Sequence, residues 1–330
     1  MTRRARPVVI GGAGFIGSAL VRTLLADGPV RVLDDFSTGS LNNLAGLPGV
    51  EVVEGSILDA ATTARALQGA GVVYHLACLG VRHSIEHPFE NHAVNALGTL
   101  NALEAARRAG AERFVYVSTS EVYGTASTVP MAEEHPTRPH TVYGAAKLAG
   151  ESYARSYALT YGFPTVVIRP FNAFGPRSHH EGDSGEVIPK FVIRAMNGLP
   201  PVVFGDGQQT RDFTFVDDTA RAISAAGVAD GVIGETINVG STKEITVNEL
   251  AQLILRVTGR EHLEPIHHDP RPGDVLRLHA DSRRAEELLG WRPQVGLADG
   301  IAALLSWHRE VGTDWNQALT EDVTLNWKAG

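Results

Sequence analysis

Six short runs of apolar residues, separated by segments of helical character, constrain this chain more than any other feature of its sequence. The runs lie at residues 7–10, 30–33, 50–53, 72–77, 114–117 and 165–168. Near-continuous hydrophobicity over so few residues is typical of strands buried on both faces, as in a parallel sheet covered by helices. The pattern therefore predicts a doubly wound α/β domain built on a parallel, Rossmann-type sheet.

The spacing of the remaining patterns suggests a second part of the chain. Helices are expected at 18–27, 90–109 and 142–161, the second ending at Gly110 because glycine commonly follows a helix C-terminus. After Arg169, Pro- and Gly-rich stretches interrupt short helices. We expect residues 1–170 to form the first domain and residues 171–330 to form mainly a smaller C-terminal substrate-binding domain, with a segment near 211–240 returning to the first.

Composition excludes several functional classes. A net charge of −8 disfavours nucleic-acid binding, which depends on phosphate neutralisation by Lys and Arg. The single cysteine, Cys78, rules out an internal disulfide or a Cys-based zinc site and is better explained as a packing residue than as a nucleophile. No stretch has membrane-spanning length, and the apolar N-terminal run suggests a strand rather than a leader. These features favour a cytoplasmic protein.

Other catalytic signatures are missing or incomplete. The chain has 13 histidines, including the pair His83/His87 and two doublets at 179–180 and 267–268, but no third ligand accompanies them in a recognisable pattern. We expect no metal and place these histidines at the surface or the rim of a pocket. The absence of a G-x-S-x-G motif argues against a hydrolase of that type.

A glycine-rich turn lies between the first predicted strand and the first predicted helix. Gly11, Gly14 and Gly17 give the spacing G-x-x-G-x-x-G in the sequence GGAGFIG. Such a turn lets backbone N–H groups approach a pyrophosphate at a helix N-terminus, where the helix dipole favours negative charge. Asp34 ends the second strand roughly 20 residues further on, where a carboxylate bonds the ribose hydroxyls and repels a 2′-phosphate. The combination favours NAD over NADP.

A tyrosine and a lysine lie one helical turn apart. Tyr143 and Lys147 form Y-x-x-x-K on a predicted helix, which puts both side chains on one face. An adjacent ammonium is expected to lower the pKa of the phenol and make it a usable acid or base. Ser118, Thr119 and Ser120 follow a predicted strand at the carboxyl edge of the sheet, where a hydroxyl can hold the substrate.

Together these residues resemble the extended short-chain dehydrogenases known as NAD-dependent sugar-nucleotide epimerases/dehydratases. The resemblance covers nearly the whole chain and rests on GGAGFIG, LDD, HLA, VNALGTLN, STSEVYG, YGAAK, RPFNAFGPR, VIPKF, GDGQQTRDFTFVDD and RPGDV. It implies that Thr119, Tyr143 and Lys147 carry the chemistry, with Ser120 and Glu121 beside them. It also implies a homodimer, in which the helices at 90–109 and 142–161 pair across a two-fold axis; solution mass by light scattering tests this.

The resemblance further implies two sets of binding residues. Those expected around NAD are Gly11, Gly14, Phe15, Ile16, Gly17, Asp34, Asp35, Ser37, Thr38, Gly39, Ser56, Ile57, Leu76, Ala77, Cys78, Asn95, Ser118, Tyr143, Lys147 and Pro170. Those expected around a nucleotide-sugar, with UDP as the nucleotide, are Arg82, Ser84, Thr119, Asn172, Val187, Lys190, Val203, Arg211, Arg271 and Asp274. Arginine suits the diphosphate because its planar fork of donors matches phosphate oxygens.

The chain departs from the family pattern at two cofactor positions. Ile10 replaces the usual Thr before the glycine loop, which is a mild change. Ser56 replaces an Asp that commonly contacts adenine, although Asp59 is near in sequence.

Residue 120 bears on the reaction. In the family mechanism Tyr143 takes the proton of the sugar C4 hydroxyl while hydride leaves C4 for the nicotinamide. The resulting 4-ketone leads to epimerisation, dehydration or decarboxylation. Typical 4,6-dehydratases have Asp where this chain has Ser120, and serine is a poor replacement acid. STSEVYG also resembles UDP-glucuronate decarboxylases, whereas VRHSIEHP and RPGDV resemble the 4-epimerases of UDP-hexoses and UDP-hexuronates.

We therefore predict a UDP-sugar 4-epimerase. A UDP-glucuronate decarboxylase or a 4,6- or 5,6-dehydratase is the alternative, with Glu121 as the residue that separates them. A non-catalytic NAD-binding sensor ranks lower because Thr119, Tyr143 and Lys147 are all present. Residues 312–330, with Trp315 and Trp327, fit either a docked helix or a frayed end.

Overall fold

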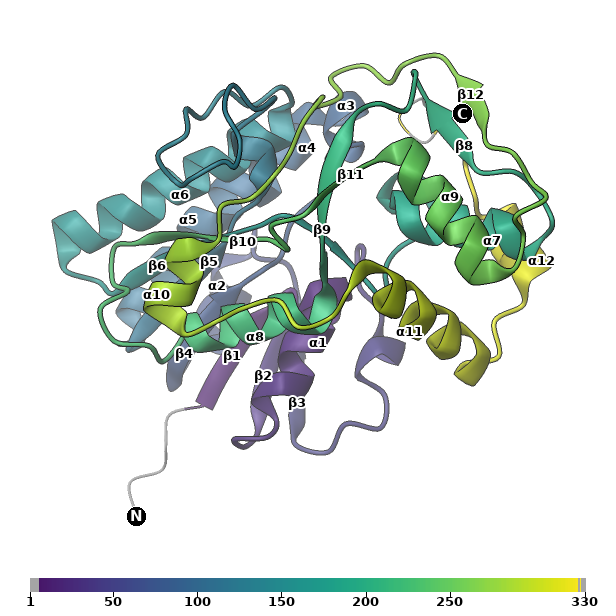
Figure 1. The fold of residues 1–330 in the computed structure, drawn as a ribbon. Helices are drawn as coiled ribbons and strands as arrows, with labels where there is room; N and C mark the ends of the chain where they lie inside the picture. Colours follow the sequence, from purple (N-terminus) through teal and green to yellow (C-terminus); the bar gives the residue numbers. More distant parts are fainter. Residues whose placement is uncertain (1–5, 326, 328–330) are drawn as a thin grey trace.

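The computed structural model describes residues 6–325 and Trp327. Its centre is a seven-stranded parallel sheet in the order β10-β6-β5-β4-β1-β2-β3 (Figure 1). The strands are β1 Arg6–Ile10, β2 Val30–Asp34, β3 Val50–Glu54, β4 Ala70–His75, β5 Arg113–Val117, β6 Thr165–Pro170 and β10 Thr236–Val239. The order reverses between β1 and β4, and a ligand crevice is expected at such a switch point. The predicted doubly wound parallel sheet is confirmed.

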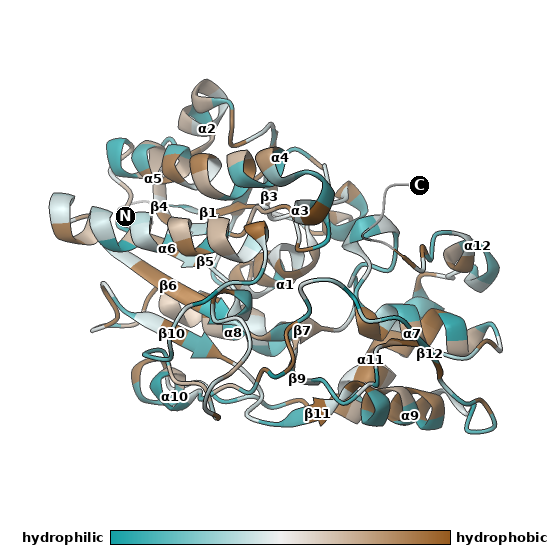
Figure 2. Ribbon diagram, turned by 90° about the horizontal axis from the view of Figure 1, so that it is seen from above, coloured by the Kyte–Doolittle hydropathy of each residue, from teal (hydrophilic) through white to brown (hydrophobic). Residues whose placement is uncertain are grey.

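Helices cover both faces of this sheet. Helices α2 Ala60–Ala66, α5 Thr99–Arg108 and α6 Val142–Tyr161 lie on one face, and α1 Phe15–Leu24 and α8 Val216–Ala226 pack together on the other. The view from above in Figure 2 shows the sheet between these two layers. Each face has its own apolar cluster, which explains why the inner strands are hydrophobic at successive positions rather than at alternate ones. The run at 50–53 differs from the expectation, because β3 is an edge strand and Val52 is 39% exposed.

Two of the expected helices differ from the prediction. Helix α1 begins at Phe15 rather than residue 18, because the glycine turn leads directly into it. The run expected at 90–109 comprises α4 Pro88–His92, a π-helical turn at Ala93–Gly98 and α5. Within that turn Asn95 exchanges hydrogen bonds with the backbone of Leu79, at 2.9 and 3.0 Å. By contrast, α6 has the predicted bounds, and a Thr141 side-chain cap and left-handed Gly162 define its ends.

The remaining elements form a second lobe, which faces the carboxyl ends of the central strands (Figure 1). They comprise the sheet β11-β9-β7, the pair β12-β8 and four helices around a separate apolar core. Their bounds are β7 Asn172–Phe174, β8 Val202–Phe204, β9 Thr210–Phe215, β11 Glu244–Thr246, β12 Ile266–His268, α7 Val187–Met196, α9 Val247–Thr258, α11 Leu297–Glu310 and α12 Trp315–Thr320. Short turns lie at α3 His83–Glu86, η1 Leu41–Leu44, η3 Ser120–Val122 and η4 Gly182–Ser184. Among the described helices, none is long and apolar enough to cross a membrane.

The chain returns twice from the second lobe to the large sheet. After β9, α8 packs against α1, and β10 pairs with β6 at the sheet edge. Later α10, Arg283–Leu289, packs on β10 and α8. No pattern in the sequence predicted this second return, and the division of the chain at residue 170 stays a prediction.

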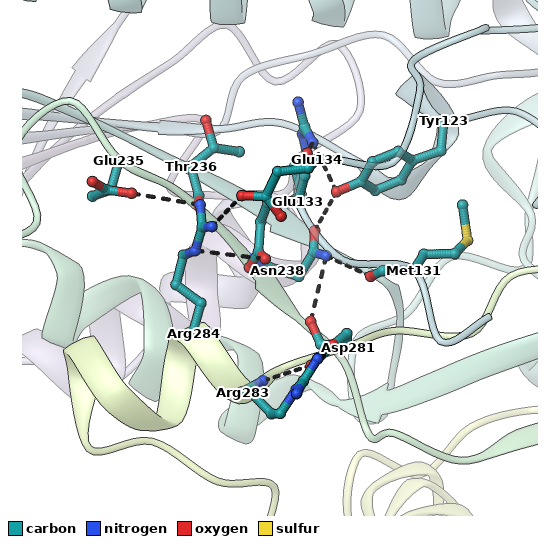
Figure 3. Close-up of polar contacts among 11 residues, drawn as sticks. Tyr123, Met131, Glu133, Glu134, Glu235, Thr236, Asn238, Asp281, Arg283 and Arg284 are labelled. Atoms are coloured by element: carbon teal, nitrogen blue, oxygen red, sulfur yellow. Dashed lines mark hydrogen bonds and ion pairs between the residues drawn. The ribbon is translucent and has the colours of Figure 1, made fainter. Parts of the chain in front are cut away.

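Polar contacts around Asn238 tie β10 to the loop that follows β5 (Figure 3). The Tyr123 hydroxyl donates to Asn238 Oδ1 at 2.7 Å, and Asn238 Nδ2 donates to the carbonyls of Met131, at 2.9 Å, and Asp281, at 3.4 Å. Arg284 of α10 joins the same region through the Thr236 carbonyl at 3.2 Å. Asn238 is fully buried, and Tyr123 and Met131 are buried with it. The contacts fix the position of the 118–124 loop.

Replacing this side chain should destabilise the protein. Asn238→Ala removes the acceptor of the buried Tyr123 hydroxyl and one donor from each of the Met131 and Asp281 carbonyls, and we expect a loss of about 1–3 kcal/mol in the free energy of unfolding. Urea denaturation measures it. The matched control Asn42→Ala, at an exposed asparagine, should change stability by less than about 0.5 kcal/mol. Equal effects of the two substitutions would contradict the role assigned to Asn238.

Candidate active site

A cleft of about 440 Å³ lies between the carboxyl ends of the central strands and the second lobe. Its walls come from the glycine turn, the ends of β2, β4, β5 and β6, helix α6 and, across the cleft, α7, β8 and β9. This is the crevice expected where the strand order reverses.

The three glycines of the turn have different steric environments. Gly11 has φ +80°, and a Cβ there would lie 2.5 Å from the Ala77 backbone nitrogen; a Cβ on Gly17 would lie 2.0 Å from the Gly11 carbonyl oxygen. Packing within the protein therefore requires glycine at positions 11 and 17. Gly14 is extended, and the nearest atom to its Cβ would be 3.4 Å away. Because Gly14 lines the cleft, its missing side chain leaves room for a ligand at the N-terminus of α1.

Asp34 lies at the end of β2 beside this turn. Its carboxylate accepts hydrogen bonds from the backbone N–H groups of Ala13, at 2.8 Å, and Phe36, at 2.9 Å. Burial raises the pKa of Asp34, and the two backbone donors oppose that rise. The carboxylate is thus held rigidly at the cleft wall with lone pairs left for a diol.

Lys147 is buried beneath the 118–124 loop. Its ammonium donates to the Val117 carbonyl at 2.7 Å and lies 4.5 Å from the centre of the Tyr116 ring. Burial lowers the pKa of Lys147. The contact fixes α6 to the carboxyl end of β5, one turn from Tyr143.

Tyr143 is partly buried in the cleft wall, and its pKa differs from the sequence-based expectation. Burial raises the pKa of its phenol well above the usual value, and a hydrogen bond with Thr119 opposes the rise. The predicted lowering of this pKa is therefore wrong for the structure described, in which desolvation outweighs any effect of the nearby ammonium.

The three hydroxyl residues after β5 have distinct surroundings. The Ser118 hydroxyl donates to Glu151 Oε1 at 2.6 Å within a buried network that includes Arg169, so it braces the loop. Thr119 lines the cleft and accepts from the Glu121 backbone N–H at 3.2 Å. Ser120, 3% exposed, also lines the cleft. All three residues line the cleft, but the Ser118 hydroxyl is already bonded to Glu151, so Thr119 and Ser120 are the ones that can meet a substrate.

Glu121 faces a group of arginines across the cleft. Burial raises the pKa of its carboxyl, and the charges of Arg211, Arg271 and Arg82 oppose the rise. Asp274 Oδ1 accepts from Arg211 at 2.7 Å and from Arg271 at 2.6 Å, holding both guanidinium groups. Three arginines converging on one cleft suit a diphosphate.

Glu186 is a cleft residue that the sequence reasoning missed. It precedes α7 without capping the helix by its side chain, and burial raises its pKa to about 7, against the charges of His179 and Arg82. Nothing in its sequence context distinguished this carboxylate from a surface residue at a helix start.

Most of the expected binding residues meet in the cleft, and a few do not. The expected residues that line it are Gly11, Gly14, Phe15, Ile16, Gly17, Asp34, Asp35, Ser37, Thr38, Ile57, Leu76, Ala77, Cys78, Arg82, Ser118, Thr119, Ser120, Glu121, Tyr143, Lys147, Pro170, Asn172, Val187, Lys190, Arg211, Arg271 and Asp274. Those outside its lining are Gly39, Ser56, Ser84, Asn95 and Val203.

The residues outside the lining have structural contacts. Gly39 packs behind Asp34, where a Cβ would lie 3.0 Å from its Oδ1. Ser84 bonds the Val81 carbonyl at 2.6 Å, and Val203 lies in the core of the second lobe. Ser56 accepts from the Leu58 N–H at 3.3 Å.

Asp59 and Asn95 are also used by the fold itself. Asp59, considered as a substitute for the missing adenine contact, caps α2 through the Ala61 N–H at 3.0 Å. Asn95 is fully buried and holds the Leu79 backbone.

Histidines do not assemble a metal site among the described residues. The rings of His83 and His87 lie 4.9 Å apart, and His180 pairs with Glu321 at 3.1 Å. The expectation that the histidines lie at the surface or at a pocket rim is wrong for His75. This residue is fully buried on β4, and its ring bonds the Thr99 hydroxyl at 3.0 Å.

Comparisons with known proteins agree with this geometry. A family model described as GDP-mannose 4,6 dehydratase matches residues 8–304. A UDP-glucose 4-epimerase of Mycolicibacterium smegmatis is 40% identical over 312 residues, covering 92% of this chain and 98% of that protein. An epimerase structure from Methanothermobacter thermautotrophicus has a TM-score of 0.90 at 36% identity, covering 96% of this chain and 94% of that one. The NAD-bound dTDP-glucose 4,6-dehydratase DesIV of Streptomyces venezuelae has a TM-score of 0.88 at 35% identity, covering 95% and 99%.

The buried histidine beneath the site should make stability depend on pH. Burial lowers the pKa of His75 from 6.5 to about 3, so the unfolded chain binds more protons between these values. The stability that neutral His75 contributes is therefore complete above pH 6.5 and falls as pH drops, by up to about 1.4 kcal/mol per pH unit. Urea unfolding of His75→Gln should show a flatter acid limb than the wild type, whereas the exposed-site control His262→Gln should not. Parallel limbs for wild type and His75→Gln would contradict this account.

Proposed function

The chain belongs to the GDP-mannose 4,6-dehydratase family of extended short-chain dehydrogenases/reductases, and on that premise we propose that it is an NAD-dependent 4-epimerase of a UDP-sugar. The observation that carries the proposal is the grouping of Tyr143, Thr119 and Lys147 beside a glycine turn, with Ser120 at the position of the dehydratase acid.

The cleft residues fit NAD. The space beside Gly14, at the N-terminus of α1, is not filled by other atoms of the protein, and it suits the pyrophosphate. The fixed carboxylate of Asp34 suits the adenosine ribose hydroxyls and disfavours a 2′-phosphate. NAD bound in this cleft would accept hydride from the sugar and add a positive charge that favours the phenolate of Tyr143.

The residues of this chain supply the proton transfer. Tyr143 takes the proton of the sugar C4 hydroxyl as the C4 hydride leaves, producing a 4-ketone, and returns it when hydride comes back on the other face. Thr119 bonds the phenol oxygen, and Lys147, anchored on the Val117 carbonyl, holds the turn of α6 that carries Tyr143. The arginine group formed by Arg82, Arg211 and Arg271 holds the diphosphate while the sugar turns over.

The residue at position 120 favours epimerisation over elimination. Dehydration needs a proton donor for the departing hydroxyl, and the Ser120 hydroxyl has too high a pKa for that task. Burial raises the pKa of Glu121, and the charges of three arginines oppose that rise, so this carboxyl does not by itself separate the two reactions. The 40% identical epimerase of M. smegmatis supports the same choice. A UDP-glucuronate decarboxylase is the second candidate, because loss of carbon dioxide from the 4-ketone requires no acid at residue 120.

Removing the phenol hydroxyl tests the assigned acid/base. We expect Tyr143→Phe to lower kcat by about 10²–10⁴-fold with UDP-glucose, because no other described side chain in the cleft is placed to replace it. Initial rates of C4 inversion measure this. Tyr161→Phe, on the same helix but 56% exposed, is the matched control and should retain the wild-type rate. Retention of activity in Tyr143→Phe would refute the role of Tyr143.

Glu121 separates the two candidate reactions. In an epimerase it serves mainly as a counter-charge to the arginines, so Glu121→Gln should reduce kcat by less than about tenfold and leave the product unchanged. In an enzyme that eliminates water, the same change removes a proton acceptor and should cost about 10²-fold or more. Product analysis and kcat of the holoenzyme variant decide between them.

A further inference from the structure

The last described residues form one wall of the cleft. Helix α12 packs on α7, and Asp322, Thr324 and Trp327 then line the cleft beside Lys190 of α7 and Phe204 of β8. We call these three residues the C-terminal wall. The tail is therefore docked along the cleft rather than frayed at residues 312–325 and Trp327.

Asp322 holds the cationic side chains of α7 in place. Its carboxylate pairs with Lys190 Nζ at 3.0 Å and with Arg194 Nη1 at 3.3 Å, and Lys190 also donates to the Val323 carbonyl at 2.6 Å. The Asp322 side chain is 2% exposed, whereas that of Lys190 is 13% exposed. The carboxylate thus faces α7 and not a ligand, and the ammonium keeps one of its three donors for the cleft.

Lys190 and Arg194 lie close enough to each other to need an anion such as Asp322 between them. Lys190 and Arg194 lie one turn apart on α7, where like charges repel. Burial lowers the pKa of Lys190, and the charge of Asp322 opposes that shift. Without the Asp322 carboxylate, the ammonium loses its counter-charge and keeps the Val323 carbonyl as its remaining partner on this segment.

Trp327 adds an aromatic surface to the same wall. Its ring meets Phe204 edge to face with centroids 4.7 Å apart, and it is 6% exposed. Its indole N–H is buried and has no acceptor among the described residues. An aromatic corner with one free donor suits a planar heterocycle that carries a carbonyl oxygen.

We propose that the C-terminal wall completes the nucleotide-binding end of the cleft, with Asp322 positioning Lys190 and Trp327 contacting the base of the nucleotide. The inference rests on the proposed UDP-sugar substrate. It makes Asp322 a positioning residue and Trp327 a determinant of which nucleotide binds, and neither takes part in the chemistry at C4.

Binding of UDP to the NAD-loaded enzyme tests this without requiring turnover. Calorimetric titration should give a Kd for UDP about tenfold higher in Asp322→Asn and in Trp327→Ala than in the wild type. The KM for the sugar nucleotide should rise similarly while kcat stays within about twofold, because the lost contacts act equally before and during reaction. Asp322→Glu should recover part of the affinity. Glu321→Gln changes the adjacent, exposed carboxylate that pairs with His180, and is the matched control.

The outcomes separate the inference from its premise. Unchanged UDP affinity in both Asp322→Asn and Trp327→Ala would overturn the role of the C-terminal wall, and tighter binding would show that the segment competes with the nucleotide instead. Trp327→Ala keeps the test decisive if Asp322→Asn fails to fold. Failure of the wild-type enzyme to bind UDP would contradict the proposed substrate itself, and the wall's role with it.

Discussion

The buried attachment of α6 to the ends of β5 and β6 is the interaction on which the rest of the site depends. Lys147 reaches the Val117 carbonyl at 2.7 Å, and Glu151, one turn later, accepts from Ser118 at 2.6 Å and from Arg169 at 2.7 and 2.8 Å. Charges buried this deeply add little net stability, but removal of one partner costs about 3–5 kcal/mol. Their effect here is positional, because they fix the helix carrying the tyrosine against the loop carrying the threonine.

Charged side chains of both signs line the rest of the cleft. Arginines from the first and second lobes converge on it, and carboxylates are interspersed among them. Asp274 aligns Arg211 with Arg271, whereas Glu121 and Glu186 are carboxyls whose pKa burial raises. A diphosphate entering this cleft meets donors whose geometry is already fixed, so little reorganisation is needed on binding. In the proposed function, the second lobe supplies the substrate side of the site and the Rossmann-type sheet supplies the catalytic side.

The sequence was informative where local chemistry decides structure. Hydrophobic runs, the glycine turn and the caps of α6 are each determined by near neighbours, and the corresponding strands and helix lie where expected. Contacts between distant segments were not predictable: Asn95 supports a loop instead of lining the cleft, and the pKa of Tyr143 rises because surrounding residues exclude water. Asp322 contacts Lys190 of α7 although the two residues are 132 positions apart in the sequence. No local pattern predicts that contact. The resemblance to a family predicted most of the cleft-lining residues, because members of one family share the long-range contacts that bring these residues together.

The most direct test of the account is the identity of the product. The NAD-loaded enzyme, without added reductant, would be incubated separately with UDP-glucose, UDP-N-acetylglucosamine and UDP-glucuronate, and the products followed by mass spectrometry and proton NMR. We predict a sugar nucleotide of unchanged mass with inverted configuration at C4 from at least one of them. Loss of water or carbon dioxide, with no C4 epimer, would contradict the proposal and make Glu121 central to the chemistry.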